Sequence, residues 1–427
     1  MTPAHSAPEG RHSGVPGSGS SSPERFPARR LCLASSRAAL LLVPLLVTGC
    51  AKKGFPHYAT NFREYAYVTN GGSNTVTVLD VKNLRQDRVI AVGQDPVDVT
   101  ASPTRNEVYV VNAGAPGSNG SLSVIDAETN RVNATLPLQR SPRSIDVGPS
   151  GQRAYVTNSG SNTVSVLDLQ HRLLLGVVPV GSGPEEARIS PDGDTLVVTN
   201  RKSGTVTLID PHSLQVRSTF SGCPQASDTA ILPDSSKAFI ACTGSRYVLA
   251  IALAQRPTKN HPHRQTEPDR ELAMLEVGQT PTHLALKPDG GEIFVSNFGS
   301  DTISEIDTST NEVGGAYLVG AHPAYGIVGN DDSTLWVSNF NADTIGVYSI
   351  DDGKLVHTVQ VGNGPTALAF SSDDFWLFAV DASSGDVTVV RTLAYTPNGA
   401  PIAGQMFTIL PAGRNPNSIA IKTFLAR

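Results

Sequence analysis

Charged residues, tryptophan and cysteine are scarce in this chain of 427 residues. The low charge and the absence of several motifs exclude some classes of function, and the few tryptophans and cysteines are considered below. Charged residues make up 17% of the sequence and the formal net charge is −5, so nothing indicates a nucleic-acid partner. The sequence contains no G-x-S-x-G nucleophile elbow, no zincin helix motif and no phosphate-binding loop, which removes several common catalytic signatures. The 39 Gly and 30 Pro residues favour many turns over long helices.

The N-terminal segment has the features of an export signal. Residues 1–30 are rich in Ser, Pro, Gly and Arg and contain little to bury, so we expect disorder or a start codon assigned too far upstream. Arg29, Arg30 and Arg37 then give a positive flank to the apolar run 38–47. That run is too short and too interrupted by proline to span a membrane, but it suits the apolar region of a secretory signal.

The end of this signal, Val47-Thr48-Gly49-Cys50, resembles a bacterial lipobox. The resemblance implies that Cys50 becomes the lipidated first residue of the mature chain; the alternative is an ordinary signal peptide with a coincidental Cys. Because Ala51 follows Cys50, and not the Asp typical of inner-membrane retention, an outer membrane is favoured. The prediction is a lipoprotein of the bacterial cell envelope that faces the periplasm or the cell surface and has the membrane as a partner through its lipid.

The four cysteines are consistent with export. Cys32 would leave with the signal and Cys50 would carry the lipid, so Cys223 and Cys242 are the remaining pair. Two remaining thiols in an oxidising compartment predict a disulfide. Counted backward from Pro233, the unit that holds this pair carries two extra residues, which give Cys223 slack to reach its partner. Reduced catalytic cysteines are the alternative.

One short phrase recurs through the mature chain, about 42 residues apart in most cases. "AYVTNGGSNTVTVLD" begins at Ala66, and "AYVTNSGSNTVSVLD" begins at Ala154. Related phrases close with Asn70, Asn112, Asn158, Asn200, Cys242, Asn297, Asn339 and Asp381. Internal repetition at this period indicates a solenoid or a propeller.

Each repeat contains the elements of four short strands. A proline opens an apolar strand that ends in a tight turn, as in "PEEARISPDG" from Pro184 to Gly193. The Asn-ended strand, an alternating strand and a final strand follow, with Val, Ile, Tyr and Thr at period 2. Asn, Ser and Gly between the second and third strands provide turn chemistry. Four antiparallel strands per repeat are typical of a β-propeller blade.

The two ends of the chain complete one blade. The first repeat begins directly at its second strand, and the missing proline strand is found at the C-terminus in "PNSIAIKTF", residues 416–424. We therefore expect an all-β, eight-bladed β-propeller of four-stranded antiparallel blades, closed by the C-terminal strand completing the first blade. A seven-bladed ring, with one degenerate unit as an insertion, is the alternative.

The repeated strand is similar to that of the YVTN-type β-propeller proteins, over residues 61–424. The resemblance implies the fold, and it includes bacterial exported and cell-surface proteins without implying one activity. The chain lacks the C-x-x-C-H motif of haem-carrying nitrite reductase propellers, and its two Trp do not match the Trp-rich blades of quinoprotein dehydrogenases. The predicted organisation is residues 1–49 as disordered N-terminus and signal, 50–60 as lipidated tether and 61–427 as propeller.

Functional residues are sought where the repeats differ, because features that all repeats share are explained by the scaffold. On the innermost strands, the second and fourth residues after the proline alternate toward the central channel, and there the units diverge. The predicted ligand-binding residues at the channel mouth are Asp98, Arg143, Asp146, Glu185, Glu186, Arg188, Asp228, His283 and Tyr325. Two readings remain open, a site for a cation or polar ligand and a water-filled channel lined by solvated charges.

Two further irregularities lie outside the channel. Residues 254–272 form a polar insertion that we expect to be an exposed loop. Arg201 and Lys202 replace the usual small residues at a turn and form a candidate contact for an anion.

These features favour a non-catalytic, lipid-anchored propeller that binds an envelope protein, glycan or small ligand. One alternative is an exported lactonase-like hydrolase with a divalent cation among the carboxylates at the channel mouth. Another is a structural surface-layer component.

Overall fold

The computed structural model describes residues 56–255, 267–395 and 401–426. The described residues from Pro56 onward belong to one compact unit. The predicted signal and Cys50 lie outside the described residues, as does most of the predicted insertion loop. Within the described ranges, no helix has the length and apolar character that a membrane span requires.

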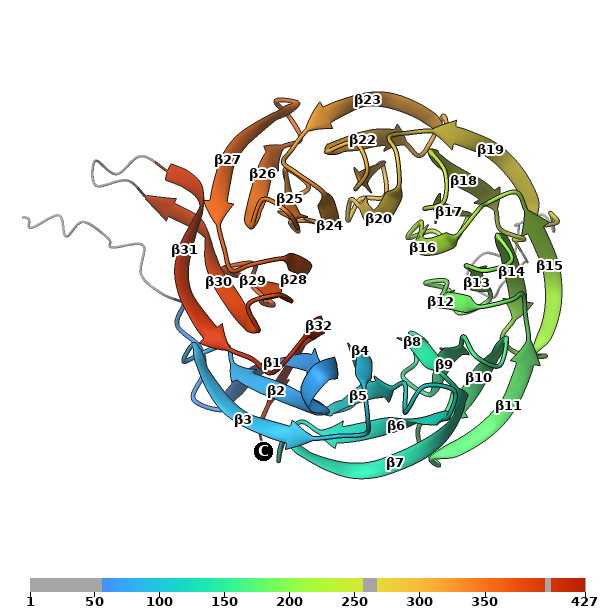
Figure 1. Ribbon diagram of the computed structural model, residues 1–427, viewed down its shortest axis with the longest axis horizontal. Coiled ribbons are helices and arrows are strands. Elements are labelled where there is room, and N and C mark those ends of the chain that lie inside the picture. The colour runs from blue at the N-terminus through green and yellow to red at the C-terminus, as the bar shows by residue number, and fades with distance from the viewer. Residues whose placement is uncertain (1–55, 256–266, 396–400, 427) are drawn as a thin grey trace, which may run out of the picture. The chain divides into compact units, whose positions relative to one another are not determined.

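The described strands form eight four-stranded antiparallel sheets, arranged as the blades of a ring (Figure 1). The innermost strands, in blades 1 to 8, are β32 (Pro416–Leu425), β4 (Pro96–Ala101), β8 (Pro142–Val147), β12 (Pro184–Ile189), β16 (Ala226–Ile231), β20 (Pro281–Leu286), β24 (Pro323–Val328) and β28 (Pro365–Phe370). The second strands are β1 (Phe62–Asn70), β5 (Glu107–Asn112), β9 (Arg153–Asn158), β13 (Leu196–Asn200), β17 (Lys237–Cys242), β21 (Glu292–Asn297), β25 (Thr334–Asn339) and β29 (Trp376–Asp381).

The two outer strands of every blade follow the same order. The third strands are β2 (Thr75–Asp80), β6 (Asn119–Asp126), β10 (Thr163–Asp168), β14 (Thr205–Asp210), β18 (Tyr247–Ala252), β22 (Thr302–Asp307), β26 (Thr344–Ser349) and β30 (Asp386–Tyr395). The outermost strands are β3 (Arg85–Ala91), β7 (Arg131–Arg140), β11 (Leu173–Pro179), β15 (Gln215–Ser221), β19 (Arg270–Glu276), β23 (Glu312–Leu318), β27 (Lys354–Gln360) and β31 (Pro401–Pro411). A short 3₁₀ helix, η1 (Gly71–Ser73), follows β1.

The predicted ring closure is confirmed. The C-terminal strand β32 pairs antiparallel with β1, from Phe62 opposite Leu425 to Asn70 opposite Pro416. This pairing gives blade 1 its innermost strand and leaves no open sheet edge between the first and last blades. The eight-bladed prediction is therefore correct, and the seven-bladed alternative is wrong for this chain.

The core lies between the blades. Eight clusters of buried apolar residues occur in the described part of the chain, and each is built from two neighbouring blades. The cluster of blades 8 and 1 contains Phe378 and Val68, and that of blades 1 and 2 contains Tyr67 and Val110. The apolar residues of the alternating strands thus form a continuous belt between the blades. The innermost strands border the channel on the inner side of this belt.

The ring has two faces. On the entry face the chain enters each innermost strand, and the residue before that strand has positive φ in every blade, as at Asp95 and Gly183. On the turn face the innermost strand turns into the second strand, as at residues 190–195. The strands between the two faces hold fixed sets of side chains toward the channel.

Candidate functional site

The repeated Asn side chains are structural. The Nδ2 group of Asn158 donates to the hydroxyls of Thr163 and Ser165 on the third strand, at 3.2 and 2.9 Å. Asn70, Asn112, Asn200 and Asn297 make the same pair of contacts in their own blades. Buried amides with hydroxyl partners fix the second strand to the third, so the phrase "YVTN" forms scaffold in this fold.

In six blades, a glycine three residues before the proline packs against the Asn or Asp that ends the second strand. At Gly181, for example, an added Cβ would lie 2.6 Å from the side chain of Asn200. That distance is shorter than any tolerated carbon contact, so these six blades require glycine at this position, whereas blade 3 has Gln139 there.

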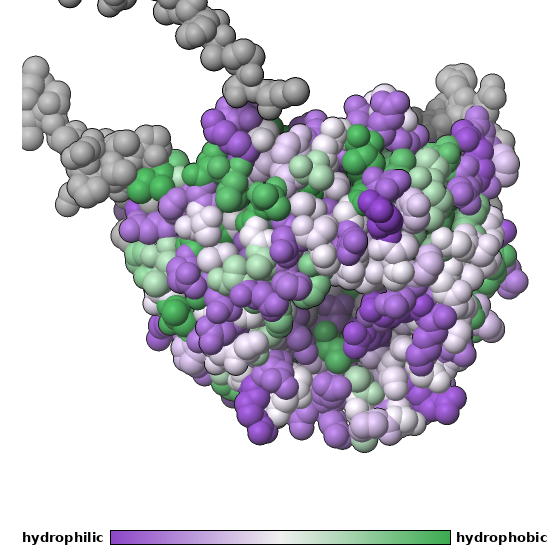
Figure 2. Space-filling model, turned by 45° about the horizontal axis from the view of Figure 1, so that its top comes forward, coloured by the Kyte–Doolittle hydropathy of each residue, from purple (hydrophilic) through white to green (hydrophobic). Residues whose placement is uncertain are grey.

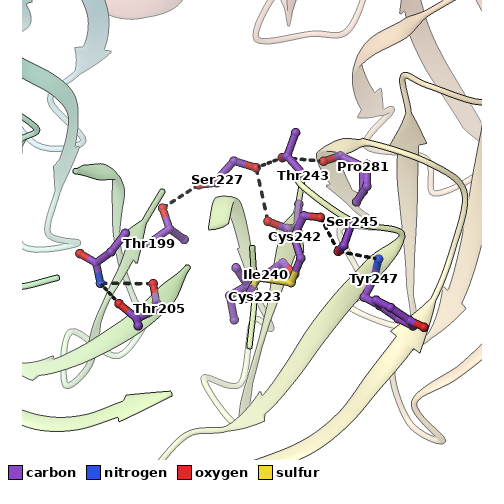
Figure 3. Close-up of a disulfide and its surroundings, with 12 residues drawn as sticks. Thr199, Thr205, Cys223, Ser227, Ile240, Cys242, Thr243, Ser245, Tyr247 and Pro281 are labelled. Carbon is purple, nitrogen blue, oxygen red and sulfur yellow. Dashed lines mark hydrogen bonds between the residues drawn. A yellow bond between two sulfur atoms is a disulfide. The ribbon is translucent and has the colours of Figure 1, made fainter. Parts of the chain in front are cut away.

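Blade 5 replaces this glycine–asparagine contact by a covalent bond. Cys223 occupies the glycine position and Cys242 the Asn position, and they form the predicted disulfide with Cα atoms 4.8 Å apart (Figure 3). Tyr247 and Leu249 stand where other blades have hydroxyl residues. The prediction of two extra residues in this unit is wrong, because Ala226 opens β16 in the position of the missing proline.

A cavity of about 350 Å³ opens at the centre of the ring. Figure 2 shows the surface hollowed near its centre, with hydrophilic residues gathered along the rim. Seven predicted site residues line this cavity: Asp98, Asp146, Glu186, Arg188, Asp228, His283 and Tyr325. Thr366, Ala367 and Ser418 line the other side, so the polarity of the channel is asymmetric, as the sequence predicts.

Arg143 and Glu185 lie elsewhere, and their predicted place in the channel is wrong. They form an ion pair with Nε and Oε1 3.0 Å apart, and both line a separate cavity of about 280 Å³ with Arg201 and Lys202. Each directly follows the proline of its strand, a position whose side chain lines the channel in some other blades, as at Thr366 and Asn417, but not in these two. Their neighbours Ser144 and Glu186 line the channel.

Three channel carboxylates join neighbouring blades. Asp98 Oδ2 accepts the backbone N–H of Ile145 at 3.0 Å. Asp146 Oδ2 accepts that of Ile189 at 2.9 Å, and Asp228 Oδ2 accepts that of Leu284 at 2.7 Å. The innermost strands of adjacent blades belong to different sheets, so these N–H groups need side-chain acceptors.

The same inter-blade contact is made by other side chains. Ser144 Oγ accepts the N–H of Ala187 at 3.2 Å, and His283 Nδ1 accepts that of Gly326 at 3.3 Å. This contact fixes the imidazole of His283, whose ring also lies 3.6 Å from that of Tyr325 between centroids. Sequence reasoning missed these contacts, although the position two residues after the proline carries them in several blades.

The electrostatic centre of the channel is the ion pair of Arg188 with Glu186. Glu186, with further help from Asp146 and Asp228, raises the pKa of Arg188. Burial raises the pKa of Glu186 to about 8, against the effect of Arg188. The side chain of Arg188 is nevertheless 43% exposed, because it reaches into the open cavity.

The pKa values of Asp98, Asp146, His283 and Tyr325 are shifted toward the neutral form of each group. Burial raises the pKa of Asp98 and of Asp146, although the hydrogen bonds that they accept lower it. Burial lowers the pKa of His283, and burial raises that of Tyr325 to about 12. Carboxyl and imidazole groups shifted in this way inside a cavity are typical of sites for acid–base chemistry.

The channel side chains do not fit a divalent cation. Nowhere in the described ranges do three or more His, Cys, Asp or Glu residues come close enough together to hold a metal ion. Asp98 and Asp146 use both carboxylate oxygens on N–H or O–H donors, and the guanidinium of Arg188 pairs with Glu186. A cation requires carboxylate oxygens that are free to bind it.

A family model described as "Lactonase, 7-bladed beta-propeller" matches residues 57–229 and 319–397. No curated protein gives a significant match. The match contradicts the prediction of a non-catalytic binding or scaffold module, and it favours the lactonase-like alternative. Absence of familiar catalytic motifs misled the sequence reasoning, because the candidate residues here are scattered over different blades.

Solved structures share the fold at low sequence identity. Dihydro-heme d1 dehydrogenase NirN has a TM-score of 0.64 at 15% identity, covering 86% of this chain and 76% of its own. Apo AztD from Citrobacter koseri has a TM-score of 0.59 at 12% identity, covering 86% and 99%. A candidate 6-phosphogluconolactonase from Bacteroides uniformis has a TM-score of 0.57 at 16% identity, covering 85% and 100%.

Proposed function

Since the chain belongs to the lactonase seven-bladed β-propeller family, built here with eight blades, we propose that it is a lactonase-like hydrolase acting in the central cavity. The observation that carries the proposal is the Arg188–Glu186 ion pair inside that cavity. Both residues lie in the matched part of the chain, as do Asp146 and Tyr325. His283 lies outside it.

Hydrolysis of a lactone requires a base for water and a positive group for the carbonyl oxygen. In our proposal Glu186, in its carboxylate form, takes a proton from water as the water oxygen adds to the ring carbonyl carbon. Arg188 stabilises the negative charge that develops on the carbonyl oxygen. The ring C–O bond then breaks, and the leaving oxygen takes the proton back from Glu186 to give a hydroxy acid.

The neighbouring residues hold this pair in place. Asp146 is fixed by the N–H groups of Val147 and Ile189 and adds negative charge beside Arg188. Because His283 Nδ1 accepts a hydrogen bond, its Nε2 carries the proton of the neutral ring. That nitrogen lies 4.0 Å from Asp228 Oδ2 and is a donor for an ester oxygen bound in the cavity.

The proposal is tested by incubating the full chain with a panel of γ- and δ-lactones near neutral pH. Release of acid is followed with a pH indicator, and open-chain esters of matched size serve as controls. The proposal predicts hydrolysis of at least one lactone well above the buffer rate. A panel that stays at the buffer rate throughout, with folded protein, would overturn it.

We also propose that the chain is a YVTN-type propeller exported to the bacterial envelope and tethered there by a lipid on Cys50. The support is the Val47–Cys50 motif after a short apolar run, together with a disulfide, which is typical of oxidising compartments. The outer membrane is the proposed location. Cys50→Ser should move the protein from the membrane fraction to the soluble fraction, and unchanged membrane attachment would refute the lipid anchor.

A further inference from the structure

Blade 8 has a longer outer hairpin than the other blades. Its strands β30 and β31 have 10 and 11 residues, whereas the corresponding strands of six blades have 6 and 7. Because Arg391 pairs with Trp376 at the start of β29, the added residues extend beyond the turn-face end of β29. In Figure 1 this end of the hairpin projects beyond the outline of the ring. Blade 2 is lengthened at Asn119 and Arg140, toward the entry face.

The turn-face half of this hairpin exposes apolar side chains, of which Leu393 lies in the added length and Met406 and Phe407 lie in the part of β31 that the outermost strands of other blades share. Leu393, Met406 and Phe407 are 48%, 45% and 47% exposed. Phe407 packs on Trp376 with ring centroids 4.9 Å apart, and Leu393 lines a groove with Trp336 of blade 7. Exposed apolar side chains that gather over buried aromatic residues indicate a contact surface.

The N-terminal end of the described chain meets the same face of the ring. The hydroxyl of Tyr58 donates to Asp373 Oδ2 at 2.8 Å, in the turn between β28 and β29, and its ring stacks on that of Phe62. Phe62 in turn pairs with Leu425, which is 61% exposed. Tyr58 lies eight positions after Cys50, and an extended chain of that length reaches at most about 29 Å.

We propose that this turn-face end of blades 8 and 1 rests on the lipid bilayer. The docking surface consists of Leu393, Met406, Phe407 and Leu425. The proposal rests on the lipid anchor at Cys50 proposed above, which brings the surface within reach of the membrane. One acyl chain binds a membrane only marginally, and stable attachment requires a second signal; further apolar contact supplies one.

The orientation leaves the proposed site open. The polar cavity is lined by the residues directly after the proline in three blades, Val97, Thr366 and Asn417, so it opens toward the entry face. With the turn face on the bilayer, that mouth points away from the lipid. A water-soluble lactone therefore reaches Arg188 without crossing the docked surface.

The test places one fluorophore on each of two matched positions of the lipidated full chain. Met406→Cys lies in the docking surface, and Leu174→Cys lies on β11 of blade 3 with a similar exposure of 46%. Cys223 and Cys242 are paired and Cys50 would be acylated, so each new cysteine is the one to be labelled. Leu393→Cys serves as a second position in the docking surface.

The labelled proteins are bound to vesicles of phosphatidylethanolamine and phosphatidylglycerol, with and without nitroxide-bearing lipid. We expect nitroxide lipid to quench the label at position 406 or 393 several-fold more than the label at position 174. Equal quenching of the labels at positions 406, 393 and 174 would overturn docking but not the lipid anchor. The same holds if the label at position 406 is shielded without vesicles, because self-association then covers the surface. Failure of every variant to float with vesicles would overturn the anchor and docking together, while lactone hydrolysis is measured separately.

Discussion

Asp98 of blade 2 accepts the backbone N–H of Ile145 in blade 3, 3.0 Å from its Oδ2 atom. Its other oxygen accepts the hydroxyl of Ser418, in the strand that closes blade 1, at 2.9 Å. One carboxylate therefore joins three blades beside the seam where the ring closes. The acidic channel wall has a structural role as well as a chemical one.

Replacing Asp98 should weaken the ring. Asp98→Ala leaves the N–H of Ile145 without its acceptor inside the channel wall, and loss of a hydrogen bond to a charged group costs about 1.5–3 kcal/mol. We expect the free energy of unfolding in urea to fall by about that amount. Asp98→Asn, which keeps one acceptor oxygen, should lose less, and Thr100→Ala is the control for a change in the same cavity. Equal stability of Asp98→Ala and the control would rule out the joining role.

The disulfide of blade 5 should stabilise the fold. In the chain-entropy model, closing a loop of this length contributes about 3 kcal/mol, so Cys223→Ala with Cys242→Ala should lose a comparable amount in urea unfolding. The measurement is made without reductant, on both proteins side by side.

Giving blade 5 the Gly and Asn of the other blades should lower the stability of the fold further. In Cys223→Gly with Cys242→Asn, the buried amide meets Tyr247 and Leu249 in place of the two hydroxyls. An unsatisfied buried donor costs about 1–3 kcal/mol, so this pair should be less stable than the alanine pair. If the Gly–Asn variant were as stable as the alanine variant, or more stable, the hydrogen bonds from Asn to the third-strand hydroxyls would not explain the stability of the other blades.

Asp381, the one carboxylate at the repeated Asn position, should make stability depend on pH. Burial raises its pKa to about 7, while Thr388 opposes the shift and Asp386 adds to it. A folded-state pKa above the unfolded value means that the folded chain binds the extra proton, so the group destabilises the fold increasingly as pH rises from about 4 to about 7, and the penalty is constant above that.

Asp381→Asn removes that charge and keeps the shape. We expect the variant to exceed the wild type by about 1–3 kcal/mol at pH 8, since one pKa unit corresponds to about 1.4 kcal/mol. The advantage should shrink toward pH 5, where Asp381 is protonated in the folded chain. Thermal unfolding at both pH values checks this, and an advantage independent of pH would contradict the role of burial.

The repeat was sufficient to predict the ring, because each unit carries the same turn and strand chemistry. The position of Cys242 in place of Asn and the C-terminal "PNSIAIKTF" strand likewise predicted the disulfide and the closure. Alternation along the innermost strands placed Asp98, Asp146 and Glu186 in the channel.

Three features were not predictable from those patterns. Arg143 and Glu185 share strands with channel residues, but they pair with each other across two blades and line a separate cavity, which the alternation along one strand does not show. The acceptor role of Asp98 depends on the distance between two sheets, which no local pattern encodes. The length of the β30–β31 hairpin is set by pairing at its far end, and its apolar residues resemble those of any strand.

The most direct measurement of the proposed function is kcat/KM for a hydrolysed lactone in Glu186→Gln and Arg188→Gln, with Thr366→Val as a control in the same cavity. Loss of a base or of an oxyanion-stabilising cation typically costs 10²- to 10³-fold, so we expect at least about a 100-fold drop in both and little change in the control. Because burial raises the pKa of Glu186 to about 8, the wild-type rate should rise with pH up to about 8, and Glu186→Gln should lack this rise. Folded variants that retain wild-type kcat/KM and the same pH profile would contradict a hydrolytic site at this ion pair.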